Sequence, residues 1–437
     1  MKVFFANLTN MPELESHPRH FLPPLDIGYC SSILKEEGHE VAFYDTSVQK
    51  SEGLIKEIKR VEPDILILKV GFEGLKLARK LVREVEIEVA AMGGLPTFMP
   101  GKFQDFDYIL PGEADAIILD FLERPEEYKE VKSIPLVEDL NSLPFPDHSL
   151  FLDKKYNFVY PTGLNKRLKF GFVQSSRGCP YNCIFCTPIE RSSFGKKWRG
   201  RSPENVLEEI LFLSSKRVNF IYFVDDLFTF DEKRIEKFCG LLRKEKLDLH
   251  WAVQSRVDRL NSKLLKEMRS AGCTTLCLGV ESGSDKILRK LRKGFNTEQS
   301  IKVSKLAKSL GFNVVLFLML GNPTETREDI EKTFQMVKSI NPDMIQIAFF
   351  TPYPGSPYFE KVGGENDIFS RHELPPKKFG ELEVDELLEE RRKFYRKFYL
   401  DLKFIFSFLR KEGISYVLNA DHFFPVLRKT LKLLGPI

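Results

Sequence analysis

Short apolar runs alternate with amphipathic stretches through most of this chain, in a rhythm typical of alternating strands and helices. Close to the N-terminus, "KVFFANL" predicts a strand, and "DIGYCSSILKEEGHEVAFYD" predicts a helix followed by a second strand. The later runs "PDILILKVG" and "EVAAMGG" are continuously apolar, as are strands of a parallel sheet that helices cover on both faces. Residues 1–125 are therefore predicted to form a doubly wound α/β domain.

The rhythm stops over residues 126–167, which contain several prolines and no sustained period, as a linker or a domain-spanning arm does. After this linker the alternation restarts. Strands are predicted at 169–175, 219–224, 249–254, 274–280, 313–319 and 344–350. Helices are predicted at 203–216, 231–246, 261–271, 297–309 and 326–339. The first of these helices has Ser202 as its N-cap. Six strand–helix repeats over residues 168–360 predict an incomplete α/β barrel, and residues 361–437 are predicted to be helical.

The composition is that of a soluble globular protein, since 43% of the 437 residues are hydrophobic and 29% are charged. No uninterrupted apolar run reaches the about 18 residues of a membrane-spanning helix, and the N-terminal segment does not read as a signal peptide. We therefore expect a cytoplasmic protein. The 66 basic and 62 acidic residues are well mixed, which gives no nucleic-acid-binding signature.

Four glycines fall at the carboxyl ends of the strands predicted in the first domain: Gly71, Gly93, Gly94 and Gly112. Ligands of open parallel sheets bind beyond these ends, where glycine lets the backbone approach a ligand closely. Glycine also simply ends strands and caps helices, so both interpretations stay open. The chain contains no G-x-G-x-x-G, and the dinucleotide fingerprint is therefore absent.

Three of the seven cysteines lie within eight positions, in "QSSRGCPYNCIFCTP", where the first predicted barrel strand passes into its loop. Active sites of α/β barrels are built at this end of the strands. Cys179, Cys183 and Cys186 could hold zinc, or a 4Fe-4S cluster with one iron left open for a substrate or cofactor. The remaining cysteines have no metal spacing and are predicted to be core residues: Cys30, Cys239, Cys273 and Cys277.

The spacing C-x3-C-x2-C after a first strand, with Phe185 before the last cysteine, resembles the signature of radical S-adenosylmethionine (radical SAM) enzymes. The resemblance implies that Cys179, Cys183 and Cys186 bind a 4Fe-4S cluster. Its open iron would chelate the amino and carboxylate groups of S-adenosylmethionine, and Phe185 would lie near the adenine. Electron transfer into the sulfonium would then give methionine and a 5′-deoxyadenosyl radical.

Further segments resemble the other barrel strands of this superfamily. "YFVDDLFTF" implies that Asp225 or Asp226 accepts from the amino group of the cofactor, and "VQSRVDRL" makes Arg256 a partner for its carboxylate. "LCLGVESGSDKILRKLRKG" implies that Glu281 faces the ribose or amino group and that Lys293 approaches the carboxylate. Each of these residues could instead have an ordinary surface or capping role.

The segment "VVLFLMLGNPTET" resembles the fifth-strand region that contacts adenine. It departs from the usual Gly-x-Pro-Gly-Glu-Thr, because Thr324 replaces the second glycine. That replacement puts the backbone geometry of this loop in question.

The order of a doubly wound domain, a proline-rich linker and a radical SAM barrel resembles the cobalamin-binding class of these enzymes. This resemblance implies a Rossmann-like, cobalamin-binding type of N-terminal domain, with Gly93 and Gly94 in "AAMGGLPTFMP" beside the cofactor. The D-x-H-x-x-G motif that supplies a histidine to cobalt in many such domains is missing, although many members of this class lack it too. A domain that keeps the fold without cobalamin stays an alternative.

The resemblance implies cobalamin-dependent C-methylation of an unactivated carbon. One alternative is ring formation, oxidation or carbon–carbon coupling on a tetrapyrrole or lipid without methyl transfer, and another is a zinc- or cobalamin-binding sensor. The implied partners are a small-molecule or lipid-like substrate and an electron donor such as flavodoxin or ferredoxin. The C-terminal "RRKFYRKFYLDLKFIFSFLRK" predicts an amphipathic helix that either packs on the barrel or makes a peripheral membrane contact.

Overall fold

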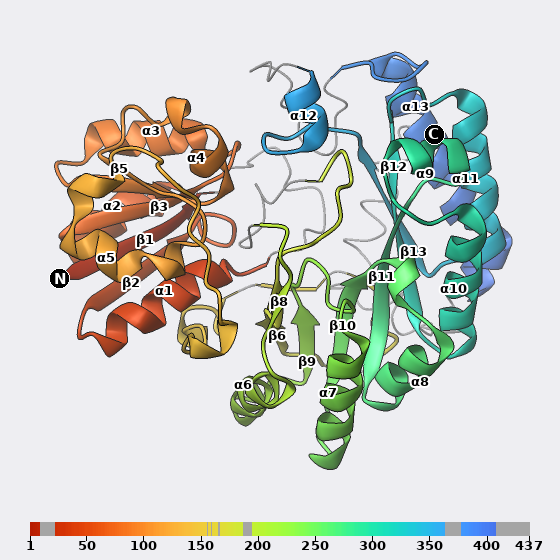
Figure 1. Ribbon diagram of the computed structural model, residues 1–437, viewed down its shortest axis with the longest axis horizontal. Helices are drawn as coiled ribbons and strands as arrows, with labels where there is room; N and C mark the ends of the chain where they lie inside the picture. Colours follow the sequence, from red (N-terminus) through yellow and green to blue (C-terminus); the bar gives the residue numbers. More distant parts are fainter. Residues whose placement is uncertain are drawn as a thin grey trace.

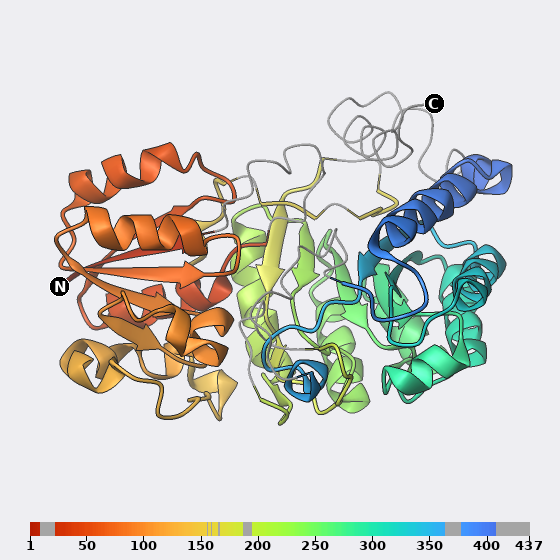
Figure 2. The same ribbon diagram turned by 90° about the horizontal axis from the view of Figure 1, so that it is seen from above.

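The computed structural model describes residues 1–8, 22–154, 156–158, 160–164, 167–186, 195–362 and 377–407. Figures 1 and 2 show two lobes side by side, an N-terminal lobe and a larger lobe built on a second sheet. Both sheets are parallel and both are covered by helices, as the continuously apolar strands predict.

The N-terminal lobe is a five-stranded parallel sheet in the order β2-β1-β3-β4-β5. Its strands are β1 (Lys2–Leu8), β2 (Glu40–Asp45), β3 (Ile65–Val70), β4 (Glu88–Met92) and β5 (Tyr108–Leu110). Its helices are α1 (Leu25–Glu36), α2 (Glu52–Val61), α3 (Leu75–Glu84), α4 (Gly94–Phe98) and α5 (Ile118–Glu123). Consecutive residues of β1, such as Phe4 and Phe5, belong to separate cores on the two faces. The doubly wound prediction is confirmed.

The second lobe is a six-stranded parallel sheet in the order β13-β12-β11-β10-β9-β6, curved into part of a barrel. Its strands are β6 (Phe170–Val173), β9 (Phe220–Phe223), β10 (His250–Ser255), β11 (Cys273–Glu281), β12 (Asn313–Leu320) and β13 (Met344–Phe349). The connecting helices are α6 (Pro203–Ser215), α7 (Glu232–Lys244), α8 (Ser262–Ser270), α9 (Asp285–Lys290), α10 (Thr297–Ser309) and α11 (Arg327–Ile340). Ser202 caps α6 by accepting from the backbone N–H of Asn205, as expected.

The linker before β6 contributes aromatic side chains to the inside of the barrel. The ring of Phe158 lies 4.8 Å from that of Tyr222 on β9, measured between centroids, and Tyr160 lies 5.6 Å from Phe317 on β12. The Tyr160 hydroxyl also donates to Gln346 of β13 at 2.5 Å. The six-stranded sheet is open and does not form a closed barrel. The aromatic side chains of the linker fill part of its interior.

A two-stranded antiparallel ribbon, β7 (Ser176–Arg177) with β8 (Arg199–Gly200), frames the loop that carries the three cysteines. Gly178 follows β7 with φ of +83°, and a Cβ there would lie 2.3 Å from the carbonyl oxygen of Lys197. Only glycine fits this close approach in the left-handed conformation. The ribbon therefore sets where the cysteine loop leaves the barrel.

Two further helices, α12 (Pro357–Lys361) and α13 (Val384–Tyr399), follow the last strand. Phe394, Tyr395 and Phe398 of α13 are buried in the barrel's outer core. The Tyr395 hydroxyl accepts from the backbone N–H of Ile347 at 2.9 Å, so α13 covers the edge strand β13. This part of the predicted amphipathic helix packs on the barrel, whereas residues 408–437 lie outside the described residues. None of the described helices is long and apolar enough to span a bilayer.

Candidate active site

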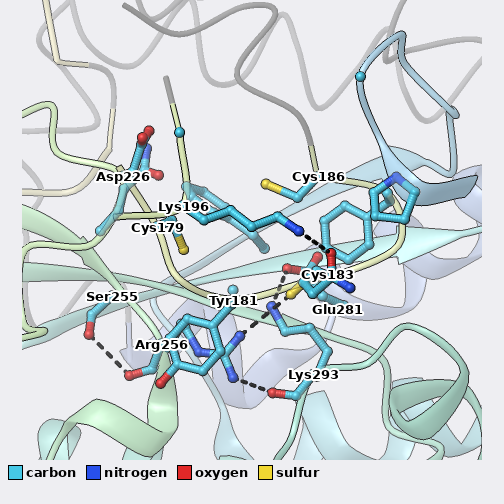
Figure 3. A pocket seen from close by; sticks show the side chains of 18 of the residues that line it. Cys179, Tyr181, Cys183, Cys186, Lys196, Asp226, Ser255, Arg256, Glu281 and Lys293 are labelled. Atoms are coloured by element: carbon cyan, nitrogen blue, oxygen red, sulfur yellow. Dashed lines mark hydrogen bonds and ion pairs between the residues drawn. The ribbon is translucent and has the colours of Figure 1, made fainter. Parts of the chain in front are cut away.

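A cavity of about 580 Å³ opens at the carboxyl ends of the barrel strands (Figure 3). Residues on or just after β9, β10, β11 and β12 meet there, and so do Phe98 of the N-terminal lobe and Ile134 and Leu136 of the linker. The sequence-predicted residues that line it are Cys179, Cys183, Phe185, Cys186, Asp226, Arg256, Glu281 and Lys293. Positions spread over more than a hundred residues of sequence are thus brought to one place.

The three clustered cysteines all border this cavity, with Cys183 buried and the other two half-buried. Their loop is held by backbone hydrogen bonds from Ile184 N–H to Leu291 and from Tyr358 N–H to Ile184. Across the described residues, no trio of Cys, His, Asp or Glu side chains is drawn close enough together to hold a metal ion. Three thiols on one loop at a barrel mouth are nevertheless the donor set that a cluster with one open iron requires.

Arg256 follows β10 and points toward the cysteine loop (Figure 3). Its guanidinium lies 3.6 Å from the Cys183 sulfur, 3.5 Å from the centre of the Tyr181 ring and 2.9 Å from each carboxylate oxygen of Asp258. Burial lowers the pKa of Arg256, but the hydrogen bonds to Asp258 outweigh it and the pKa is raised. A permanent positive charge therefore lies beside a cysteine sulfur. Two guanidinium nitrogens of Arg256 already donate to Asp258, so the pairing of Arg256 with a cofactor carboxylate stays a prediction.

Glu281 and Lys293 form a buried ion pair across the cavity wall, with 3.0 Å between the Lys293 Nζ and the Glu281 Oε1. Glu281 ends β11 at an irregularity in the pairing with β12 and has φ of +60°. The adjacent Gly279 leaves room for the pair, because a Cβ there would lie 2.9 Å from the Glu281 oxygen and 3.6 Å from Lys293 Nζ. The structure therefore brings together one carboxylate and one ammonium, the groups that complement an amino-acid zwitterion.

The two candidate aspartates after β9 have different surroundings. Asp225 is buried and accepts from the Ser175 N–H at 2.7 Å and from the hydroxyls of Ser175 and Ser176, both at 2.6 Å. Burial raises its pKa despite these bonds. Asp226 instead lines the cavity. Of the pair, Asp225 braces the start of the cysteine loop and only Asp226 borders the cavity, so its contact with a cofactor stays a prediction.

Phe185 borders the cavity and packs against an apolar cluster that includes Ile287, Met319 and Phe350. The ammonium of Lys293 lies 5.7 Å from the centre of its ring. An aromatic face beside an apolar wall is suited to stacking on a flat heterocycle.

The loop after β12 has a left-handed backbone conformation at Thr324, the position where the superfamily pattern has a glycine. Thr324 has φ of +67°, a rare conformation for a β-branched residue that costs about 1–3 kcal/mol. The buried Glu325 carboxylate holds the turn by accepting from the backbone N–H groups of Gly321 and Asn322 and from the Asn322 side chain. Burial raises the pKa of Glu325 to about 7. Threonine at this position therefore strains the loop, and the Glu325 hydrogen bonds hold it in the left-handed conformation.

The glycines of the N-terminal lobe fall into two kinds. Among the described residues, a Cβ at Gly71 or Gly93 would meet nothing closer than 3.7 Å, and Gly93 is the N-cap of α4 with φ of +106°. Gly94 is buried at the start of the same helix, which ends at Phe98 on the cavity wall. At Gly112 a Cβ would lie 2.5 Å from the Pro135 carbonyl oxygen, so packing explains that glycine. Packing therefore does not explain Gly71 and Gly93, and cobalamin contacts at this edge of the sheet stay a prediction.

Three of the four cysteines predicted to be structural, Cys30, Cys239 and Cys273, are buried in apolar cores as expected. Cys277 is also fully buried among apolar residues, but it additionally lines the cavity floor.

A buried ionic cluster that the sequence interpretation missed joins the lobes. Glu113 and Asp115 follow β5 of the N-terminal lobe, and they pair with Arg177 of β7 and Arg199 of β8. Burial raises the pKa of Asp115, whereas for Glu113 the two guanidiniums outweigh burial and lower its pKa. The sequence signal was present in "LPGEAD", where two acids follow a strand-ending glycine, but nothing in it names their partners.

A partial α/β barrel whose first loop carries three cysteines into a cavity at its carboxyl end defines the radical SAM class of enzyme. The family model described as the Radical SAM superfamily matches residues 173–337, and this chain belongs to that superfamily. Among its relatives is an uncharacterised methyltransferase from Pyrococcus horikoshii, 30% identical over 86% of this chain and 88% of the relative. The anaerobic magnesium-protoporphyrin IX monomethyl ester cyclase of Rubrivivax gelatinosus is 27% identical over 91% of this chain and 78% of that protein.

Solved structures share the complete two-lobed fold. The cobalamin-dependent radical enzyme OxsB, with aqua-cobalamin bound, superposes with a TM-score of 0.65 at 19% identity, covering 98% of this chain and 72% of OxsB. The methyltransferase TsrM from Kitasatospora setae, with cobalamin and a 4Fe-4S cluster bound, gives 0.64 at 14% identity over 83% and 78% of the two chains. The N-terminal lobe therefore has the fold found in cobalamin-dependent members of the superfamily.

Proposed function

We propose that this protein is a cobalamin-dependent radical SAM methyltransferase that methylates an unactivated carbon of a small or lipid-like molecule. The observation that carries the proposal is the shared cavity. It is lined by the three cysteines and the Glu281–Lys293 pair from the barrel and by Phe98 from the N-terminal lobe. A site bordered by both lobes can bring a radical from one cofactor and a methyl group from another to the same substrate carbon.

Cys179, Cys183 and Cys186 would hold the 4Fe-4S cluster, and Gly93 and Gly94 would border cobalamin. When bound, these groups and S-adenosylmethionine supply a hydrogen-abstracting 5′-deoxyadenosyl radical and a methyl group, with electrons from a donor such as flavodoxin or ferredoxin.

The side chains of the cavity have separate tasks in this proposal. Asp226 and Glu281 accept from the amino group of S-adenosylmethionine, Lys293 donates to its carboxylate, and Phe185 lies against the adenine. Phe98, Ile134, Leu136 and Phe317 make part of the wall apolar, which helps to exclude water from a reactive radical and suits the apolar part of a substrate.

A second candidate is ring formation, oxidation or carbon–carbon coupling without methyl transfer. The similarity to the Rubrivivax cyclase over 91% of this chain favours it. The two candidates differ in one measurable quantity, because only the methyltransferase moves a labelled methyl group from S-adenosylmethionine to a substrate. A zinc- or cobalamin-binding sensor would show no cleavage of S-adenosylmethionine under strong reduction.

The first test is cobalamin retention. The cluster is reconstituted without oxygen, hydroxocobalamin is added, the protein is desalted, and the absorption spectrum is recorded. Retained corrin bands beside the broad iron–sulfur absorption support methyl transfer and justify screening methyl acceptors. An iron–sulfur spectrum without corrin bands contradicts the proposal and favours the second candidate.

A further inference from the structure

The ribbon that frames the cysteine loop contains an unfavourable pair of like charges. Arg177 and Arg199 are register partners in the β7–β8 ladder, and both side chains are almost fully buried. Like charges directly opposite each other destabilise a strand pair, and burial removes the water that would screen them. The ribbon alone would therefore open rather than close the base of the loop.

Glu113 of the N-terminal lobe lies against both guanidiniums and, with Asp115, balances their charge. Its carboxylate accepts from Arg199 at 2.6 and 2.9 Å and from Arg177 at 3.2 Å, so one acid bridges both guanidiniums. Asp115 adds a bidentate pair to Arg177 alone, at 2.6 and 3.1 Å. Removal of Glu113 would take away the carboxylate that Arg199 shares with Arg177, while the two guanidiniums stay opposite each other.

The position of Glu113 also fixes part of the cavity wall. The Oε2 atom that accepts from both guanidiniums also accepts from the N–H of Val137 at 2.8 Å, and the N–H of Glu113 donates to the carbonyl of Pro135 at 3.0 Å. These bonds flank Leu136, which lines the cavity. One residue therefore connects the N-terminal lobe, the linker wall and both ends of the cysteine loop. Figure 1 shows β6 and β8 at the side of the barrel nearest the N-terminal lobe.

We propose that Glu113 is a positioning residue through which the docked N-terminal lobe holds the cysteine loop closed, so that cleavage of S-adenosylmethionine depends on the contact between the lobes. Arg177 precedes Cys179 by two residues, and Arg199 is followed by the strand end that leads to α6, so opening the ribbon displaces the thiols directly. The proposal uses the iron–sulfur chemistry of the superfamily and does not depend on methyl transfer.

The test is Glu113→Gln in the full-length chain, with hydrogen–deuterium exchange as the main readout. We expect peptides within residues 173–186 to exchange faster than in the wild type, while the α7–α8 region is unchanged. After cluster reconstitution, 5′-deoxyadenosine formation per bound iron should fall about tenfold or more, because small displacements of reacting groups are costly. The matched control is Glu138→Gln, which removes an exposed ion pair with Lys197 on the same loop and should change neither readout.

A rescue variant separates charge neutralisation from general packing. In Glu113→Gln/Arg199→Met, the second guanidinium is gone and Arg177 keeps Asp115, so exchange and cleavage should return toward wild type. Wild-type exchange in Glu113→Gln, or a double variant no better than the single one, would overturn the proposal. If Glu113→Gln does not fold, a folded double variant supports the proposal and an unfolded one contradicts it. The exchange measurement needs no cofactor, so its result is independent of whether the wild type transfers methyl groups.

Discussion

Gly279→Ala tests whether the Glu281–Lys293 pair binds S-adenosylmethionine. The added methyl group would lie 2.9 Å from the Glu281 Oε1, closer than side chains tolerate, and the nearest movable atom is that carboxylate. Glu281 would therefore swing away from Lys293 while the strand backbone stays in place. The side chains are only 11% and 5% exposed, and a charge-assisted hydrogen bond in such surroundings contributes about 1.5–3 kcal/mol. If this free energy is lost from cofactor binding, the affinity for S-adenosylmethionine falls roughly ten- to a hundredfold.

The assay measures 5′-deoxyadenosine formation under dithionite at increasing S-adenosylmethionine, normalised to bound iron. We expect the KM for S-adenosylmethionine to rise roughly ten- to a hundredfold. The control is Gly240→Ala on α7, where an added Cβ meets nothing within 4 Å, and which should leave KM unchanged. A wild-type KM in Gly279→Ala, with the melting temperature also unchanged, would refute a role for this pair in binding the cofactor.

The remaining predictions use other parts of the molecule. Cys183→Ala should abolish 5′-deoxyadenosine formation, and normal turnover in that variant would end the radical mechanism. Asp226→Asn should weaken S-adenosylmethionine binding, whereas Asp225→Asn should lower the melting temperature, because an amide would face the donors of Ser175 and Ser176. The folded state binds the Glu325 proton more tightly than the unfolded state, so stability should fall as pH rises from 4.5 to about 7, by roughly 3 kcal/mol in denaturant titrations. In Glu325→Gln this slope should disappear. Leu402 and Phe406 are each 68% exposed, and if the chain binds membranes peripherally, Leu402→Glu/Phe406→Glu should reduce its sedimentation with anionic liposomes.

The long buried strands could be predicted from the sequence because burial on both faces leaves a continuous apolar run. All six barrel strands lie within a few residues of the predicted ranges, and the cysteine loop follows the first of them. The ribbon was missed because β7 and β8 have two residues each, which is too short for any periodicity. Helix α9 has six residues and was missed for the same reason.

Which polar residues face the cavity was harder to predict than where the strands end. Neighbouring residues point in opposite directions at a strand end, so the sequence could not choose between Asp225 and Asp226. The pairing of Glu113 with Arg199 could not be predicted from the sequence, because Arg199 lies 86 residues further along the chain and belongs to the other lobe. Sequence patterns give local geometry, whereas ion pairs across lobes depend on how the lobes dock.

The aromatic linker side chains inside the barrel limit how this architecture can be taken apart. A fragment starting at β6 would lack Phe158 and Tyr160 and would expose Phe220 and Tyr222 of the inner face to water, when burying each ring contributes about 1.5–3 kcal/mol. A stable barrel fragment should therefore begin before Phe158, inside the connection between the lobes. N-terminal domains can be exchanged between relatives, in evolution or in a designed chimera. The barrel stays stable only if the crossover point lies before the aromatic linker segment, so that this segment stays with the barrel whose interior it fills.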